Sequence, residues 1–136
     1  MDVLASLSAF WDGRDVQHLH HPVWFRQFGD DALVARDPAG ALAGYLLAHC
    51  TPSLAYIHVV SVHPTFRGQG VARSLYDRLL AEAGRQGTER VEAITTPTNE
   101  VSVEFHLRLG FAAERVIDYA GPGEDRVVFR RFVHTP

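Results

Sequence analysis

The sequence predicts a mixed, layered α/β fold. Three observations indicate this class: short apolar runs rich in β-branched residues, turn signals between those runs, and one long amphipathic pattern with i, i+4 spacing. The 136 residues carry 46% apolar side chains, which is enough material for one core. We therefore expect a single domain over residues 1–136, with the element order α-α-β-β-β-α-β-α-β-β.

The first part of the chain predicts two short helices followed by a hairpin. The helices are expected over Asp2–Trp11 and Pro22–Gly29, because proline suits a first helical turn and glycine a helix end. Two apolar runs follow at Ala32–Arg36 and Leu42–Cys50, and the strong turn signal Asp37–Gly40 separates them. This pattern predicts two antiparallel strands, the second covered on both faces.

The middle of the chain predicts a strand, a long helix and another strand. Ala55–Val62 is rich in β-branched residues and is expected to be a strand. The amphipathic helix begins at Val71, and either Gly84 or Gly87 would end it. A short strand is expected next, over Arg90–Thr95.

The segment Val101–Leu109 carries conflicting signals. Its apolar residues alternate strictly, which by period alone favours a strand. Asn99 is a good helix N-cap, however, and Gly110 stands where a helix C-cap would. Two last strands are expected over Arg115–Tyr119 and Arg126–Val133.

Composition excludes several classes of function. With 13 basic and 16 acidic residues the net charge is −3, which argues against a nucleic-acid binder that relies on bulk positive charge. No apolar run approaches the ~20 residues of a membrane span, and the first residues lack the basic start of a secretory signal. The single cysteine, Cys50, cannot form an internal disulfide, so a reducing, cytoplasmic setting is expected.

The stretch with the most chemical information is the glycine-containing loop between the Ala55–Val62 strand and the long helix. Backbone amides at the helix start, together with the helix dipole, would make this loop an anion site suited to a pyrophosphate. Gly68 and Gly70 let the backbone approach a ligand, and Arg67 and Arg73 add charge. The loop lacks the Gly-Lys-Ser/Thr of a Walker A motif and the third glycine of a dinucleotide fingerprint. A tight turn that merely caps a helix is the alternative.

Two motifs together resemble the GNAT superfamily of N-acetyltransferases. That family's acyl-coenzyme A loop is written Gln/Arg-x-x-Gly-x-Gly/Ala, and Arg67, Gly70 and Ala72 match it. The second motif is a strand, then Asn99, then a helix that ends in Leu-Gly-Phe at 109–111. The resemblance extends from about residue 32 to residue 111.

The resemblance implies a splayed central sheet flanked by helices, with acetyl-CoA as co-substrate in the gap. Backbone groups of the preceding strand would pair with the pantetheine arm, and amides of the loop would hold the pyrophosphate. It also implies that 99–109 is helical and aims one face at the cofactor. The implied cofactor-binding residues are Val60, Ser61, Val62, Arg67, Gly68, Gln69, Gly70, Val71, Ala72, Arg73, Asn99, Ser102 and His106.

One strand of the family's fold has no counterpart in the sequence. The family has an initial strand before its first helix, whereas this chain starts directly with a helical pattern. A second copy of the chain could cover the exposed edge, so a homodimer is worth testing.

The implied reaction is attack of a neutral amine on a thioester carbonyl. A lysine-like amine has a pKa of ~10.4 and must first lose a proton. A backbone N–H within Val60–Val62 would stabilise the oxyanion. His106 stands where the family often has a tyrosine proton donor, and histidine suits proton transfer near neutral pH. His58 and Glu92 are the candidate bases, with a satisfied strand histidine and a solvated edge carboxylate as the alternatives.

The family's first two helices usually wall the acceptor pocket. The residues expected to shape it here are Asp12, Arg14, Asp15, His20 and His21. A metal site on these histidines lacks any further ligand spacing, so no metal is expected. The acceptor is expected to be a small-molecule or peptide amine, and a non-catalytic acyl-CoA-binding module of the same fold is the alternative function.

Overall fold

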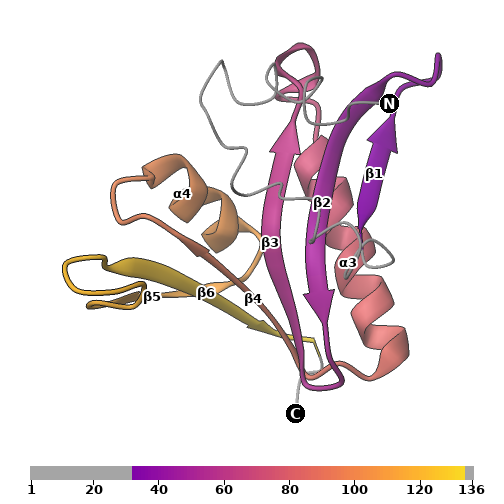
Figure 1. The fold of residues 1–136 in the computed structure, drawn as a ribbon. Coiled ribbons are helices and arrows are strands. Elements are labelled where there is room, and N and C mark those ends of the chain that lie inside the picture. Colours follow the sequence, from indigo (N-terminus) through magenta and orange to yellow (C-terminus); the bar gives the residue numbers. More distant parts are fainter. Residues whose placement is uncertain (1–31, 134–136) are drawn as a thin grey trace. The chain divides into compact units, whose positions relative to one another are not determined.

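The computed structural model describes residues 32–133. The two short helices expected before residue 32, and the expected absence of an initial strand, lie outside this range. The elements are shown in Figure 1 and run in the order β1 (Leu33–Arg36), β2 (Leu42–Cys50), β3 (Leu54–Val62), the 3-10 helix η4 (Pro64–Phe66), α3 (Val71–Gln86), β4 (Arg90–Thr95), α4 (Glu100–Arg108), β5 (Ala112–Val116) and β6 (Arg126–Phe132).

The strands form one six-stranded sheet in the order β1-β2-β3-β4-β6-β5. β1 pairs with β2 in antiparallel fashion, as the turn signal predicts, and β3 pairs with β4 in parallel. β6 lies between β4 and β5 and is antiparallel to both. The sheet is therefore mixed, and the predicted mixed α/β class is confirmed.

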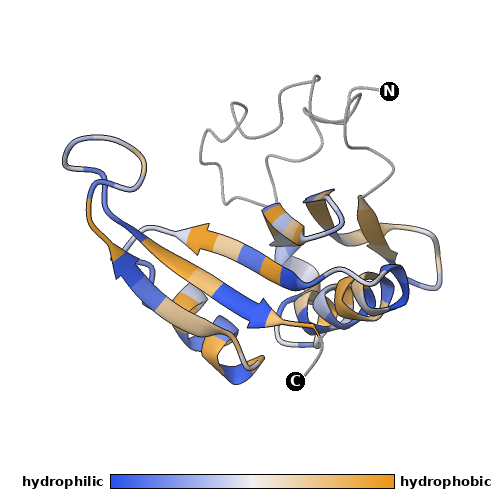
Figure 2. Cartoon of the chain, turned by 90° about the horizontal axis from the view of Figure 1, so that it is seen from below, coloured by the Kyte–Doolittle hydropathy of each residue, from blue (hydrophilic) through white to orange (hydrophobic). Residues whose placement is uncertain are grey.

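The chain falls into two compact units. The first contains β1, most of β2, the end of β3 from His58 onward, and α3 as far as Leu79. The second contains the start of β3, the end of α3, and all of β4, α4, β5 and β6. Leu46 and Leu75 are buried in the first unit, and Val91 and Phe129 in the second. Burial alternates along β3, whereas most of β2 is buried. Figure 2 shows both hydrophilic and hydrophobic residues on the strands.

Two helix boundaries resolve questions that the sequence leaves open. α3 continues through Gly84 to Gln86, and Gly87 ends it with a φ of +72°. α4 is a helix despite its alternating pattern, because the Asn99 side chain accepts a hydrogen bond from the Ser102 amide at 3.2 Å and caps the first turn. Gly110, at φ +84°, follows the end of α4. No helix within residues 32–133 is long and apolar enough to cross a membrane.

The strand predicted over Arg115–Tyr119 is wrong in its position. β5 instead runs from Ala112 to Val116, because the chain pairs with β6 directly after the glycine that follows α4. It stops where Asp118 turns the backbone with a φ of +55°, a conformation that aspartate tolerates better than most residues. The Gly121–Gly123 segment was expected to form the whole connection between the last two strands, so the turn at Asp118 was not predicted.

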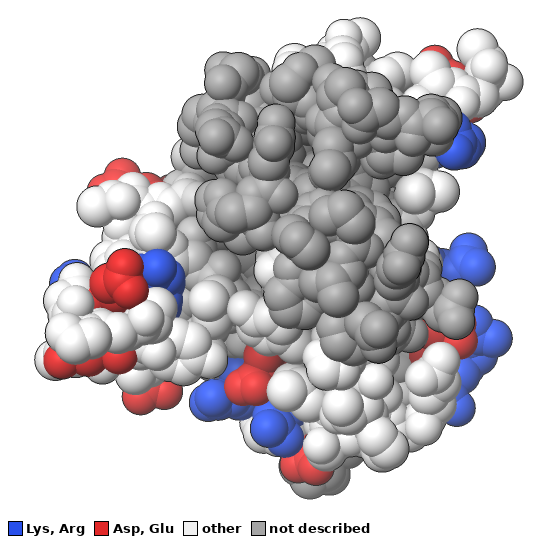
Figure 3. Space-filling model, in the orientation of Figure 1, with Lys and Arg blue, Asp and Glu red and all other residues white. Residues whose placement is uncertain are grey.

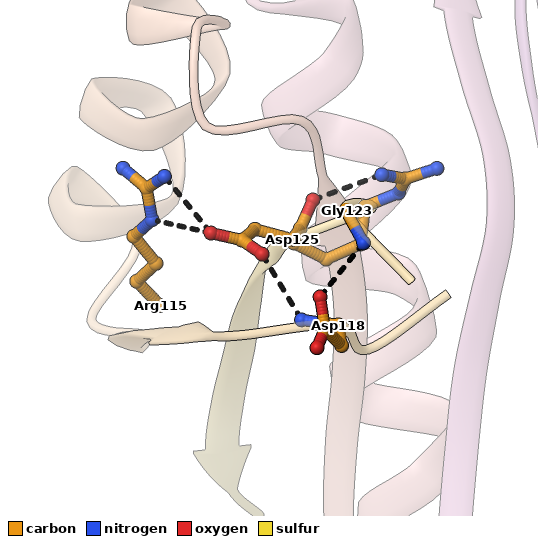
Figure 4. A network of polar contacts seen from close by, with 5 residues as sticks. Arg115, Asp118, Gly123 and Asp125 are labelled. Atoms are coloured by element: carbon orange, nitrogen blue, oxygen red, sulfur yellow. Dashed lines mark hydrogen bonds and ion pairs between the residues drawn. The ribbon is translucent and has the colours of Figure 1, made fainter. Parts of the chain in front are cut away.

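A network of polar contacts holds the β5–β6 connection (Figure 4). The Arg115 guanidinium donates to Asp125 Oδ2 from Nε at 3.2 Å and from Nη2 at 2.9 Å. The Asp118 amide donates to Asp125 Oδ1 at 3.0 Å, and the Gly123 amide donates to Asp118 Oδ1 at 2.8 Å. The hydrogen bond from the Asp118 amide, followed by Arg115, holds the pKa of Asp125 below its ordinary value. Of the two carboxylates in this turn, that of Asp125 makes the larger number of contacts.

Replacing that carboxylate should loosen the turn without unfolding the sheet. In Asp125→Ala we expect the Asp118 amide to exchange with solvent about tenfold faster, because its charge-assisted acceptor is gone. Asp125→Asn is the matched control, since it keeps an oxygen for the Asp118 amide and loses only the charge. Hydrogen exchange measured by NMR gives both values, and equal exchange rates in the wild type and Asp125→Ala would contradict the assignment.

Candidate active site

The segment between β3 and α3 is organised by its own hydrogen bonds. His63 Nδ1 accepts from the Thr65 amide at 3.1 Å and caps η4. Arg67 Nε donates to the Val62 carbonyl at 3.2 Å, and Gln69 Nε2 donates to the Thr65 carbonyl at 3.4 Å. The Arg67 contact ties the loop back to the end of β3, and the Gln69 contact ties it to η4.

The last part of this loop is open and carries two left-handed glycines. Gly68 has a φ of +77° and Gly70 a φ of +79°, and a Cβ built on either would have no heavy atom within 4 Å. The Gly70 carbonyl accepts from the Ser74 amide at 3.0 Å, so Gly70 caps α3. The first-turn amides from Val71 to Arg73 have no acceptor within the helix, by helix geometry, and they lie at its positive end. This exposed arrangement fits an anionic group such as a pyrophosphate.

The strand before the loop alternates in burial. Val59 and Ser61 are buried, while Val60 and Val62 are half-buried. In the second unit the parallel β3–β4 ladder pairs Leu54–Tyr56 with Arg90–Glu92. The Val60–Val62 segment lies further along β3, in the first unit, next to the loop that it precedes.

The side chains expected to share one face of α4 do so, in the second unit. Asn99 Oδ1 accepts from the Ser102 amide, and the Ser102 carbonyl lies 2.7 Å from His106 Nδ1. Ser102 Oγ is 3.4 Å from the same nitrogen. The helix thus connects its N-cap to His106 through Ser102, which an alternating strand would not do.

His106 is buried among aromatic rings, with 4% of its surface exposed. Its ring stacks on Phe129 with a centroid distance of 3.9 Å and an interplanar angle of 5°, and it meets Phe105 and Phe111 edge-on at 5.4 Å each. Burial lowers the pKa of His106, and the hydrogen bond to the Ser102 carbonyl opposes this effect. Burial thus favours the neutral imidazole. Because a carbonyl oxygen can only accept, the proton of that ring is assigned to Nδ1.

Glu92, one of the two candidate bases, lies in a cross-strand ion pair. Its Oε1 accepts from Arg130 Nε at 2.9 Å, and its Oε2 lies 3.5 Å from Arg90 Nε. Both carboxylate oxygens thus face a guanidinium, an arrangement typical of sheet-stabilising pairs. His58, the other candidate, is half-buried on β3 in the first unit.

Tyr56 belongs to the same row of side chains as Glu92. It stands opposite Glu92 in the β3–β4 ladder, and Glu92 stands opposite Arg130 in the β4–β6 ladder. Burial raises the pKa of Tyr56, and the nearby Tyr119 and Glu92 raise it further. Its hydroxyl is therefore a hydrogen-bond donor throughout the neutral range. Only the strand register reveals this row, because the three residues are far apart in the sequence.

Comparison with known proteins decides the family. The family model described as the acetyltransferase (GNAT) family matches residues 3–111. The chain belongs to the GNAT acetyltransferase family. The resemblance based on the 67–72 loop and on Asn99 with its helix is thereby confirmed.

Individual relatives of this GNAT chain are distant. It is 27% identical over 101 residues to an uncharacterized N-acetyltransferase of Methanocaldococcus jannaschii, covering 69% of this chain and 45% of that protein. It is 32% identical over 123 residues to the L-2,4-diaminobutyric acid acetyltransferase of Streptomyces coelicolor, covering 79% and 72%. The chain thus spans less than half the length of the first of these relatives.

Solved structures show the same fold. YncA of Salmonella typhimurium, solved with its cofactor acetyl-CoA, superposes with a TM-score of 0.70 at 24% identity, covering 97% of this chain and 84% of that one. The GNAT fold implied by the two motifs is therefore confirmed.

The expected acceptor residues of this GNAT chain lie outside the described range: Asp12, Arg14, Asp15, His20 and His21. Within residues 32–133, no group of three His, Cys, Asp or Glu side chains is placed to hold a metal ion. Both basic and acidic side chains of the described residues are visible on the face in Figure 3.

The buried His106 should make stability depend on pH. The pKa of His106 in the folded chain lies below the ordinary value of 6.5. The stabilisation of the folded state that this creates is therefore fully present above pH 6.5, and it is lost as the pH falls from there toward the lowered pKa. We expect the free energy of unfolding to fall more steeply between pH 7.5 and pH 5.5 in the wild type than in His106→Phe. Urea titrations at each pH measure this, with His49→Gln, at an exposed histidine, as the control. Parallel curves for wild type and His106→Phe would contradict burial of a neutral imidazole.

Proposed function

We propose that this GNAT chain transfers the acetyl group of acetyl-CoA to a primary amine of a small molecule or peptide, by direct attack in a ternary complex. The loop from Arg67 to Arg73 carries this proposal, because it combines two left-handed glycines with the positive end of a 16-residue helix. YncA, which shares the fold, has acetyl-CoA as its cofactor. When bound, acetyl-CoA supplies the activated thioester carbonyl.

The cofactor would be held by two adjoining segments of the first unit. Backbone groups of Val60–Val62 would pair with the pantetheine amides in the manner of an added strand. Amides from Gly68 to Arg73 would hold the pyrophosphate, and the exposed Arg73 would add a charged contact. Arg67 Nε donates a hydrogen bond to the Val62 carbonyl and thereby fixes the loop to that strand.

His106 is the proposed proton carrier of the reaction. Its neutral ring would accept the proton lost by the amine and pass it to the departing sulfur. Because burial lowers the pKa of His106, the protonated ring would give up this proton readily. We propose His58 as the base that first takes a proton from the ammonium form of the amine; the proton lost after attack is the one that His106 carries. His58 is preferred to Glu92, since both oxygens of Glu92 face guanidinium groups.

A non-catalytic acyl-CoA-binding module is the second candidate function. One observation favours it: the residue at the position of the usual donor is a buried histidine among three phenylalanines. Core packing alone accounts for a histidine in these surroundings, without a role in proton transfer.

An acceptor screen separates the two candidates. The chain is incubated with acetyl-CoA and a panel of diaminobutyrate, polyamines, aminoglycosides and peptides, and thiol release is followed over the rate without acceptor. The chain contains no lysine, so any acetyl-lysine formed belongs to the added peptide. We expect release with one class of amine, and none with its N-acetylated form as control. Saturable acetyl-CoA binding without release for any amine would leave only the binding module.

A further inference from the structure

Gly44, inside the buried strand β2, stands at an unusually close contact of the first unit. A Cβ added at this position would lie 2.8 Å from Val71 Cγ1 and 3.0 Å from the Ser61 carbonyl oxygen. Leu75 Cδ1 would be 3.5 Å away. The first distance is shorter than real Cβ contacts allow, and the second is tighter than nine in ten of them, so a side chain here would force its neighbours to move.

The two closest neighbours belong to the two segments proposed to hold the cofactor. Val71 is the first residue of α3 and follows Gly70 directly. Ser61 lies in the middle of the Val60–Val62 segment. The Ser61 contact is with backbone, and the hydrogen bond from the His63 amide to the Ala43 carbonyl, at 2.8 Å, ties the end of β3 to β2 beside it. Because this hydrogen bond holds β3 against β2, we expect an added methyl group to displace the first turn of α3 rather than β3.

We propose that Gly44 is a positioning residue for acetyl-CoA: its missing side chain lets the first turn of α3 lie close enough to β2 and β3 to align the loop amides with the Val60–Val62 strand. The inference rests on the proposed function. It adds a residue outside the loop motif, on a strand that is not expected to contact the cofactor. A displacement of the order of 1 Å at a positioning element can cost up to about a hundredfold in function.

Gly84, which lies in α3 like Val71, provides a matched control for Gly44. A Cβ at Gly84 would meet only Val133 Cγ1, at 3.7 Å, which is ordinary van der Waals contact. Gly84 also has no left-handed φ, so alanine fits its backbone. Gly84→Ala should therefore leave acetyl-CoA binding unchanged.

The test compares Gly44→Ala, Gly84→Ala, Val71→Ala and the double variant Gly44→Ala/Val71→Ala. We expect Gly44→Ala to raise the Kd and the KM for acetyl-CoA by roughly tenfold, with the KM for the amine unchanged. Val71→Ala removes the nearest atom, so the double variant should recover most of the affinity, and the two substitutions should be non-additive. If Gly44→Ala does not fold, the double variant is compared with Val71→Ala alone, and we expect their Kd values to agree within about threefold.

Three outcomes would overturn the inference. The first is a wild-type Kd in Gly44→Ala, and the second is a loss of thermal stability without a change in Kd or KM. The third is a double variant that binds acetyl-CoA no better than Gly44→Ala or, where that variant does not fold, much more weakly than Val71→Ala. A wild-type chain that does not bind acetyl-CoA contradicts the proposed function instead, so the two failures are distinguishable.

Discussion

Gly70→Asp should abolish acetyl-CoA binding. Gly70 caps α3 with a φ of +79°, and the space around its missing side chain is open. A carboxylate built there would stand at the helix start, where the pyrophosphate is proposed to lie. We expect the Kd to rise by about a hundredfold or more, because placing like charges side by side in an interface costs several kcal/mol. Calorimetric titration of acetyl-CoA gives the Kd.

Two control variants separate charge from strain in this experiment. Gly70→Asn has the same size and the same tolerance of a left-handed backbone, but no charge. We expect it to weaken binding much less than aspartate does. Gly40→Asp places an aspartate at a φ of +89° in the turn between β1 and β2, and we expect it to leave the Kd unchanged. If Gly70→Asp binds acetyl-CoA like the wild type, the loop is not the pyrophosphate site.

His106→Phe should lower turnover far more than cofactor affinity. A phenyl ring suits the site, because it can stack on Phe129 as the imidazole does at 3.9 Å. What it lacks is a group that carries a proton and the contact to the Ser102 carbonyl. General acid–base catalysis contributes about 10²–10⁴ in rate, so we expect kcat to fall by roughly a hundredfold while the Kd for acetyl-CoA changes by less than about threefold.

Steady-state thiol release with the best amine measures this effect. His106→Tyr is the informative companion variant, since a phenol hydroxyl restores a proton donor and the GNAT resemblance implies tyrosine at this position. We expect it to recover part of the turnover that phenylalanine loses. An unchanged kcat in His106→Phe would remove His106 from the mechanism and favour a packing role.

Local signals in the sequence predicted most of the strands and the helix α3. For α4 the local signals conflicted, and the GNAT resemblance implied the helix. The cap positions Asn99 and Gly110 agree with that helix, whereas the alternation of Val101–Leu109 favoured a strand. The end of α3 was ambiguous, because an isolated glycine such as Gly84 is tolerated in a helix interior. The β5 strand was misplaced because Asp118, rather than a glycine, makes the first turn.

Features that depend on register and packing could not be predicted. The row Tyr56, Glu92 and Arg130 exists only because three strands pair in one particular register. The ring that stacks on His106 belongs to Phe129, which is distant in sequence. The glycine within the apolar run of β2 did carry a signal, since a glycine inside a strand often marks a close approach. Its neighbours Ser61 and Val71 become known only from the fold.

Titration of acetyl-CoA into the wild-type chain by isothermal calorimetry tests whether the chain binds acetyl-CoA, on which the proposed function depends. Because the loop from Arg67 to Arg73 is already shaped by its own hydrogen bonds, we expect one saturable site per chain, with a Kd well below millimolar. Absence of binding at millimolar acetyl-CoA would contradict both the acetyltransferase and the acyl-CoA-binding module.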